Sequence, residues 1–135
     1  MAEIKHPIQE AERYLQNARQ ILSDKAEKDG DYYNDRKYVR MAGNTAWNGV
    51  LLALDAVLPV RATLKKGQRP EFQDYQAAIA KSDGKMTRVV LNAYELLHKS
   101  IGYDGITSYR AIQDSLDQAR KVIDWANVRY ANGTN

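Results

Sequence analysis

The stretch DRKYVRMAGNTAWNGVLLALDAVL, from Asp35 to Leu58, decides the fold of this chain. At helical spacing it gathers small residues on one side: Ala42, Ala46, Gly49 and Ala53. Larger apolar side chains flank that side: Tyr38, Val39, Val50 and Val57. Because a helix that is apolar around most of its circumference must be surrounded by other helices, we expect it to be the central helix of a bundle. Its small side leaves room for neighbouring backbones to approach closely.

Helical periodicity predicts four more helices around this one. Their expected bounds, in chain order, are Pro7 to the turn at Asp29–Asp31, about Glu71 to Ala80, about Lys85 to Ile101, and a cap at Thr107 or Ser108 to about Tyr130. Their expected inward residues are Ile8, Ala11, Leu15, Ala18, Ile21 and Leu22, then Phe72, Tyr75 and Ile79, then Met86, Val89, Val90, Ala93, Leu97 and Ile101, and last Ile112, Leu116, Ala119, Ile123, Ala126 and Tyr130. No segment shows sustained alternation with period two. The prediction is an all-α antiparallel bundle of four long helices plus one short helix.

Length and composition limit the class of protein. A chain of 135 residues is the usual size of one domain, so we expect a single helical-bundle domain over residues 1–135. The longest apolar run, Val50 to Leu54, is too short to span a bilayer, which predicts a cytoplasmic protein that does not enter the membrane. The net charge of +3 is too small to imply nucleic acid as a partner by itself.

Several chemistries lack the residues to support them. The absence of cysteine removes thiolate nucleophiles and thiolate metal sites. Glu95-x-x-His98 is half of a di-metal bundle motif, but both residues lie off the expected inward face, so His98 is interpreted as a surface or boundary residue. Asp29–Asp35 does not have calcium-loop spacing and is interpreted as a turn with helix caps. No catalytic residue, metal or cofactor is therefore predicted.

A polar stripe on the central helix is the first candidate site for a ligand. The stripe and the tryptophan beside it consist of Arg40, Asn44, Trp47, Asn48 and Asp55. In a cleft, Arg40 could bind an anion through its planar guanidinium, the asparagines could orient the ligand, and Trp47 could form a wall. The favoured interpretation is the solvent face of a mostly buried helix. A deeply buried Arg40 paired with Asp55 or another carboxylate is a third, structural interpretation.

Two further features suggest contact surfaces. Four basic residues occur without an acidic neighbour between Asp55 and Glu71, at Arg61, Lys65, Lys66 and Arg69, and are candidate phosphate contacts. A solvated loop explains them equally well. Trp47 and Trp125 lie off the expected inward faces, so one or both are expected to be exposed in a homodimer contact; the alternative is that loops or the short helix cover them.

The run Asp35–Trp47, followed by Val50–Leu54, resembles the second helix of HEPN-type bundles, in which an Arg- and Tyr-containing start leads into a small-residue helix. The helix order is also similar to that of small substrate-binding subunits of nucleotidyltransferases, and the whole chain resembles an uncharacterised bacterial family known only as a domain of unknown function. The HEPN resemblance implies a shared bundle and a tendency to dimerise. The ribonuclease motif of that group, an Arg followed after four to six residues by a His, is missing: His6 has no Arg before it, and nine residues separate Arg88 from His98.

The sequence therefore favours a non-catalytic helical-bundle module that acts through protein–protein contacts, as a homodimer or with another protein. The alternative is a HEPN-like RNA- or nucleotide-binding protein that lacks the usual Arg/His motif. A third hypothesis is a small anionic ligand bound in a cleft along the polar stripe. Nucleic acid is a possible but less favoured partner.

Overall fold

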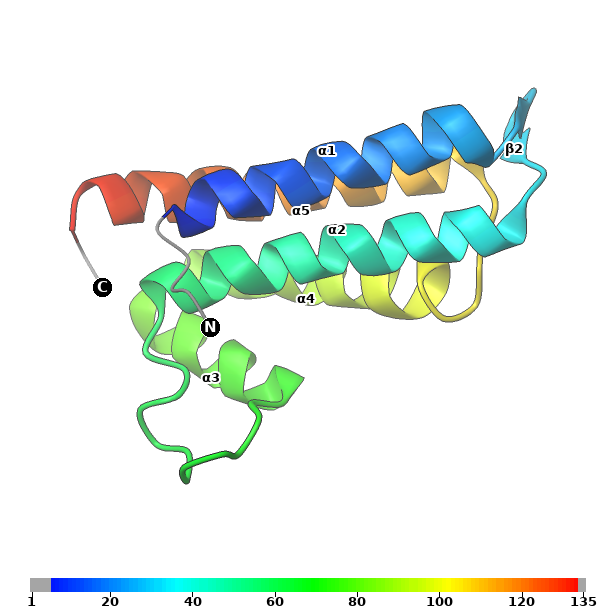
Figure 1. The fold of residues 1–135 in the computed structure, drawn as a ribbon. Coiled ribbons are helices and arrows are strands. Elements are labelled where there is room, and N and C mark those ends of the chain that lie inside the picture. Colours follow the sequence, from blue (N-terminus) through cyan, green and yellow to red (C-terminus); the bar gives the residue numbers. More distant parts are fainter. Residues whose placement is uncertain (1–5, 134–135) are drawn as a thin grey trace.

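The computed structural model describes residues 6–133 and is dominated by helices (Figure 1). The α-helices are α1 (Pro7–Lys25), α2 (Arg36–Val57), α3 (Phe72–Ser82), α4 (Thr87–Ala93) and α5 (Tyr109–Ala131). A 3-10 turn, η1 (Gly84–Met86), precedes α4, and a π-helix, η2 (Tyr94–Ile101), follows it. The strands β1 (Lys28–Asp29) and β2 (Tyr32–Tyr33) form an antiparallel hairpin between α1 and α2. Two residues per strand are too few to produce an alternating pattern, so the sequence did not reveal this hairpin.

The helix boundaries follow local capping chemistry. Pro7 is the first residue of α1, where its missing N–H loses no helical hydrogen bond. The Asp35 carboxylate accepts a hydrogen bond from Lys37 N and caps α2. Of the two predicted caps for α5, Ser108 is the one observed, because its hydroxyl accepts from Ala111 N.

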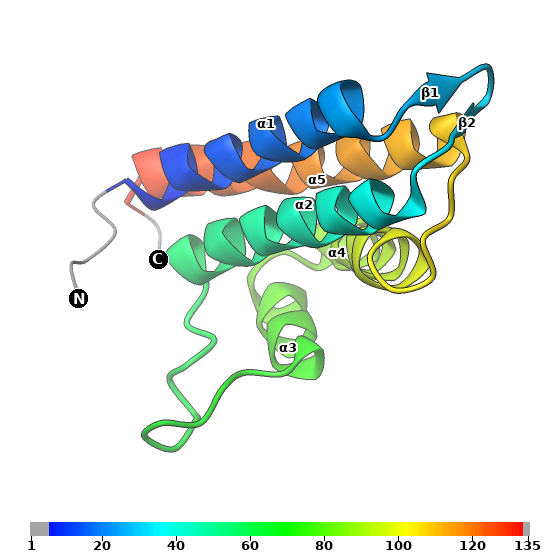
Figure 2. The same cartoon turned by 45° about the vertical axis from the view of Figure 1, so that its right-hand side comes forward.

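The four long helical segments run in alternating directions, as Figures 1 and 2 show. The third of these long segments is composite, since η1, α4 and η2 together occupy the predicted helix 85–101. Helix α2 contacts α1, α5 and η2, while α3 packs at one end against η1 and α4. The predicted all-α class is confirmed. No helix among residues 6–133 is both long and apolar enough to cross a membrane.

The small side of α2 is enclosed, as predicted. Ala46 and Ala53 have no solvent exposure. A β-carbon added at Gly49 would lie 2.9 Å from Ala11 O and 3.0 Å from Tyr14 Cβ, so α1 passes α2 at a distance that only glycine permits there. This close approach is why the second helix can serve as the centre of the bundle.

The two tryptophans correct one expectation. Trp47 is only 6% exposed, because Phe72 of α3 and Tyr94 of η2 lie against it, with ring centroids 6.1 and 5.4 Å away. Trp125 is half-buried, and its Nε1 donates a hydrogen bond to Asp83 at 3.0 Å. The predicted exposure of Trp47 is wrong; the alternative, cover by the short helix, is observed. Tyr130 also differs from prediction, since it is 40% exposed near the end of α5.

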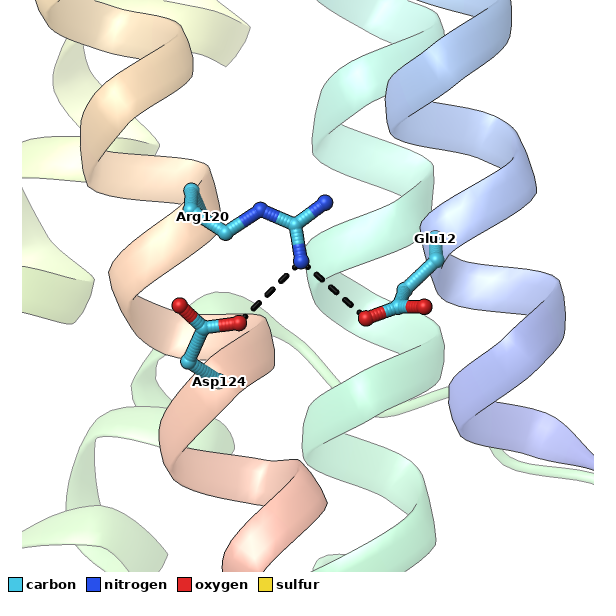
Figure 3. Close-up of polar contacts among 3 residues, drawn as sticks. All are labelled: Glu12, Arg120 and Asp124. Atoms are coloured by element: carbon cyan, nitrogen blue, oxygen red, sulfur yellow. Dashed lines mark hydrogen bonds and ion pairs between the residues drawn. The ribbon is translucent and has the colours of Figure 1, made fainter.

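An arginine links the first and last helices on the surface. Arg120 Nη1 lies 3.1 Å from carboxylate oxygens of both Glu12 in α1 and Asp124 in α5 (Figure 3). Partial burial acts to lower the pKa of Arg120, but the hydrogen bonds and charges of Asp124 and Glu12 outweigh it, and the pKa is raised. One guanidinium thus joins α1 to α5 through its ion pair with Glu12.

Candidate functional site

The predicted polar stripe is divided between two places in the structure. Arg40, Asn44 and Asn48 are exposed, whereas Trp47 is buried beside them. Arg40 lies over the segment after η2: a β-carbon at Gly105 would be 2.9 Å from Arg40 Nε. Asp55 lies 15 residues further along α2, a rise of about 22 Å from Arg40. Because Arg40 is exposed, the structural alternative of a deeply buried Arg40 paired with Asp55 or another carboxylate is wrong.

Asp55 of α2 contacts the first turn of α3. It accepts a hydrogen bond from Tyr75 Oη at 3.0 Å and pairs with Arg61 Nη2 at 3.6 Å. Burial raises the pKa of the Tyr75 phenol, and the charge of Asp55 and the hydrogen bond to it raise this pKa further. These contacts give Asp55 a structural role at the junction of α2, α3 and the segment between them.

Asn44 lines a cavity. Its side-chain amide Nδ2 donates to Gly102 O at 3.3 Å, across 58 residues of sequence. The cavity measures about 570 Å³ and is lined by Asn44, Tyr94, His98, Lys99, Gly102, Tyr103 and Asp104; we call it the Asn44 pocket. Its volume lies within the range of small-molecule sites, roughly 300–1,000 Å³.

Aromatic rings form one wall of the Asn44 pocket. Tyr94 stacks on Phe72 with centroids 3.8 Å apart and planes 7° from parallel. The imidazole of His98 lies 5.5 Å from the ring of Tyr94 and 6.1 Å from that of Trp47. Lys99 Nζ lies 5.3 Å from the centroid of Tyr94, a favourable position for a cation beside a π-system. His98 is exposed, which confirms the predicted surface or boundary position.

The π-helix η2 gives this wall its geometry. The Gly102 amide donates to Leu97 O at 2.8 Å, a bond to the fifth residue back instead of the fourth. Such widened turns are rare, and they occur frequently at functional sites. In this structure η2 supplies Tyr94, His98 and Lys99 to the pocket. Sequence reasoning discounted His98 and missed Tyr94 and Tyr103; the spacing of Tyr94 and His98, four residues apart, was the available signal.

The pocket can recognise a planar or polar group. Its lining includes the rings of Tyr94, His98 and Tyr103, the side-chain amide of Asn44, and the exposed charged groups of Lys99 and Asp104. Within residues 6–133 there is no group of three or more His, Cys, Asp and Glu side chains placed to hold a metal ion.

The four basic candidates lie on the segment that joins α2 to α3, which extends away from the bundle (Figure 1). All four are exposed: Arg61, Lys65, Lys66 and Arg69. Arg61 forms an ion pair with Asp55. Their assignment to phosphate contacts stays a prediction.

Comparison with known proteins gives a family and a fold. The family described as "Domain of unknown function (DUF5618)" matches residues 6–128. A solved structure, described as a protein of unknown function from Dyadobacter fermentans, is 36% identical, with a TM-score of 0.84 over 95% of this chain and 99% of that one. No curated protein matches the chain. The likeness covers nearly the whole of both chains and carries no description of an activity.

Proposed function

Because the chain belongs to the DUF5618 family, a domain of unknown function, we propose its role from its own surface. The proposed function is that of a non-catalytic, cytoplasmic helical-bundle module, one domain over residues 1–135, which acts through protein–protein contacts. The proposed first partner is a second copy of the same chain.

The observation that supports this proposal is a set of exposed large apolar side chains on segments that meet at one end of the molecule. Tyr103 is 79% exposed, Tyr32 59% and Ile106 44%. Tyr32 forms an isolated antiparallel β-bridge with Ser108, and Tyr33 N donates a hydrogen bond to Thr107 O. The β-hairpin and the segment after η2 therefore lie together at this end of the molecule (Figure 2). We call Tyr32, Tyr103 and Ile106 the hairpin-end surface. Exposed tyrosine is enriched at protein interfaces, where it buries a large apolar area and retains a hydrogen-bonding hydroxyl.

The hairpin-end surface adjoins the Asn44 pocket, because Tyr103 belongs to both. Interfaces derive most of their affinity from a few side chains that fill pockets at the centre of the contact. A side chain of the partner that entered the Asn44 pocket would meet Tyr94 and His98 and could bond to Asn44. The pocket and the exposed residues together would form one contact site.

Light scattering across a range of protein concentrations tests this proposal. The wild-type protein is expected to show the mass of a dimer at high concentration, and the double variant Tyr103→Ser, Ile106→Ser that of a monomer. Val128→Ser is the matched control: Val128 is 60% exposed and lies in the last turn of α5. Figure 1 shows that this end of α5 lies away from the hairpin. The control is expected to dimerise like the wild type.

Each other outcome changes the conclusion. A dimer that the double variant leaves intact, or that Val128→Ser dissociates, would place the contact elsewhere. A monomer at every concentration, combined with no protein retained from cell lysate, would reject the contact function itself.

The Asn44 pocket favours a second candidate, a HEPN-like protein that binds a nucleotide or RNA without the ribonuclease motif. Ring surfaces for a base and the cation of Lys99 for a phosphate support it. The exposed basic segment at Arg61 and Lys65 would add phosphate contacts. A raised thermal midpoint with a nucleotide, lost in Lys99→Ala, would support this candidate, since a ligand that binds only the native state stabilises it. An unchanged midpoint with every nucleotide and with RNA would remove it.

A further inference from the structure

Another cavity lies between the last turns of α1, the β-hairpin and the first turns of α5. It measures about 410 Å³ and is lined by Arg19, Leu22, Ser23, Lys28, Tyr33, Tyr109, Gln113 and Leu116. We call it the α1–α5 pocket. It shares no lining residue with the Asn44 pocket, and its volume lies within the range of small-molecule sites.

The charged side chains that line the α1–α5 pocket are both positive. Arg19 is half-buried on α1, and Lys28 is exposed on β1. Neither side chain forms an ion pair with a carboxylate within residues 6–133. Lys28 Nζ instead lies 4.5 Å from the centroid of the Tyr109 ring. Two cations without a carboxylate among the lining residues favour an anionic ligand.

The two helices beside the pocket show where a negative charge is missing. Helices α1 and α5 run antiparallel (Figure 1), and one layer of their contact is the ion pair of Glu12 with Arg120 (Figure 3). Arg19 follows Glu12 by seven residues, and Gln113 precedes Arg120 by seven, so each lies two turns away on the same helix face. The second layer therefore places a cation beside a neutral amide, and an anionic ligand would complete it.

The uncharged polar groups of the lining include hydrogen-bond donors. A phenol is protonated at neutral pH, and burial, followed by the neighbouring phenol of Tyr109, raises the pKa of Tyr33 further. The side-chain amide of Gln113 adds two N–H groups. Ser23 is already engaged, because its Oγ donates to Asp24 Oδ1 at 3.2 Å, and Asp24 lies outside the lining.

A phosphate matches these groups better than a carboxylate does. The donors come from three elements, with Arg19 on α1, Lys28 on the hairpin and Gln113 on α5. A phosphomonoester carries a charge of about −1.5 to −2 at pH 7 and has three acceptor oxygens that point in different directions. A carboxylate has one charge and two oxygens in one plane, which suits a single guanidinium fork.

The pocket also has apolar surface beside its polar groups. Leu22 and Leu116 are buried and belong to the lining. The rings of Tyr33 and Tyr109 have centroids 5.7 Å apart. An apolar group attached to the phosphate would cover these side chains and gain affinity from their burial. This favours a phosphate ester over free phosphate.

We propose that the α1–α5 pocket binds a phosphomonoester with an apolar organic group. The phosphate would lie between Arg19 and Lys28 and accept a hydrogen bond from Gln113, and the organic group would cover Leu22 and Leu116. The site shares no residue with the hairpin-end surface or the Asn44 pocket, so it stands or falls independently of the proposed contact function.

Isothermal titration of the full chain with phenyl phosphate, in a buffer without phosphate, tests the proposal. Phenyl phosphate is expected to bind at one site, and benzyl alcohol, which has the ring without the charge, at least about tenfold more weakly. Inorganic phosphate should bind several-fold more weakly than phenyl phosphate. No binding of phenyl phosphate, or equal affinity for phenyl phosphate and benzyl alcohol, would overturn the proposal. Equal affinity for inorganic phosphate would overturn the assignment of an ester.

Two variants locate the charge and one serves as control. Lys28→Gln, at an exposed position where folding is not at stake, is expected to weaken phenyl phosphate binding several-fold. Arg19→Gln should weaken it by at least about tenfold; its circular dichroism shows whether it folds. Lys25→Gln removes an exposed lysine from the last turn of α1, outside the lining, and should bind phenyl phosphate like the wild type. Equal losses of affinity in Lys25→Gln and Lys28→Gln would overturn the proposal.

Gln113→Glu supplies the missing charge from the protein itself. The new carboxylate beside Arg19 would repeat the arrangement of Glu12 and Arg120, so phenyl phosphate should bind at least about tenfold more weakly. The thermal midpoint of the variant without ligand should stay close to that of the wild type, which separates lost binding from lost folding. Wild-type affinity in Gln113→Glu would overturn the placement of the phosphate beside Arg19.

Amide chemical shifts measured during the phenyl phosphate titration locate the ligand. Changes are expected in residues 19–23, 28–33 and 109–116, the three parts of the chain that line the pocket. Changes centred on Asn44 and His98 instead would overturn the assignment to the α1–α5 pocket.

Discussion

A β-carbon placed on Gly43 would lie 2.8 Å from the backbone nitrogen of Gly102. It would also lie 2.7 Å from Ile101 Cγ2 and 2.9 Å from Leu97 O, so α2 and the end of η2 are in contact through backbone atoms at this point. The next residue, Asn44, donates a hydrogen bond to Gly102 O. The tight crossing and this hydrogen bond together fix the position of the Asn44 pocket against the central helix.

Gly43→Ala should therefore destabilise the protein. The added methyl group cannot move away from two backbone atoms, and overpacking of this kind costs about 1–3 kcal/mol, more than alanine gains in helix propensity. Urea denaturation measures the difference. Gly84→Ala is the matched control, since nothing lies within 4 Å of its added β-carbon. A Gly43→Ala protein as stable as the wild type would show that the two helices separate easily.

The Tyr75–Asp55 contact predicts a pH dependence of stability. The folded state raises the pKa of Tyr75 above its ordinary value of 10.0, mainly through burial, so the phenol stays protonated when the unfolded chain begins to ionise. This contribution to stability is complete below pH 10 and is lost as the pH rises above it, by up to about 1.4 kcal/mol per pH unit. In Tyr75→Phe, the free energy of unfolding should therefore fall less steeply as the pH rises above 10.

At neutral pH, Tyr75→Phe should lower the free energy of unfolding by about 1 kcal/mol, the net contribution of a typical hydrogen bond. The measurement is the free energy of unfolding in urea at several pH values from neutral to above 10. If the free energy of unfolding fell equally with pH in the wild type and in Tyr75→Phe over the alkaline range, Tyr75 would not be the source of the pH dependence.

Asp83 connects α3 to α5. Its Oδ1 accepts from Lys85 N and caps the 3-10 turn, while its Oδ2 accepts from Trp125 Nε1. A double-mutant cycle with Asp83→Ala and Trp125→Phe isolates the second contact from the cap. We expect a coupling free energy of about 1 kcal/mol or more, because the acceptor is charged. Additive effects of the two substitutions would mean that the contact contributes nothing to stability.

Arg120 predicts a salt-dependent link between α1 and α5. Its side chain is 38% exposed, so the two ion pairs are screened by solvent. Arg120→Met should cost about 0.5 kcal/mol at low ionic strength and less in concentrated salt. Arg13→Met is the comparison, because Arg13 pairs with Glu10 inside one helix. Equal salt dependence in the two variants would show that the ion pairs of Arg120 stabilise the protein no more than the Arg13–Glu10 pair within one helix.

The bundle itself was predictable because its signals are local. A helix is defined by residues three and four apart, so the small side of α2 could be recognised from Ala42, Ala46 and Gly49 without knowing what covers it. Start signals are equally local: Pro7 predicted the start of α1, which is observed there, whereas the predicted start of α2 lay between Asp31 and Asp35, and the structure places the cap at Asp35. Where the signal weakened, at the end of α5, the prediction placed Tyr130 on the wrong side.

The sequence by itself determined the helices, their order and the enclosure of α2, because each depends on neighbours within about one turn. Only the tertiary structure decided that Trp47 is covered by Phe72, that Asn44 meets Gly102, and that Asp55 bonds to Tyr75 instead of approaching Arg40. The physical reason is that a pocket forms where faces of distant segments meet, and the angle and depth of that meeting depend on the packing of every side chain between them.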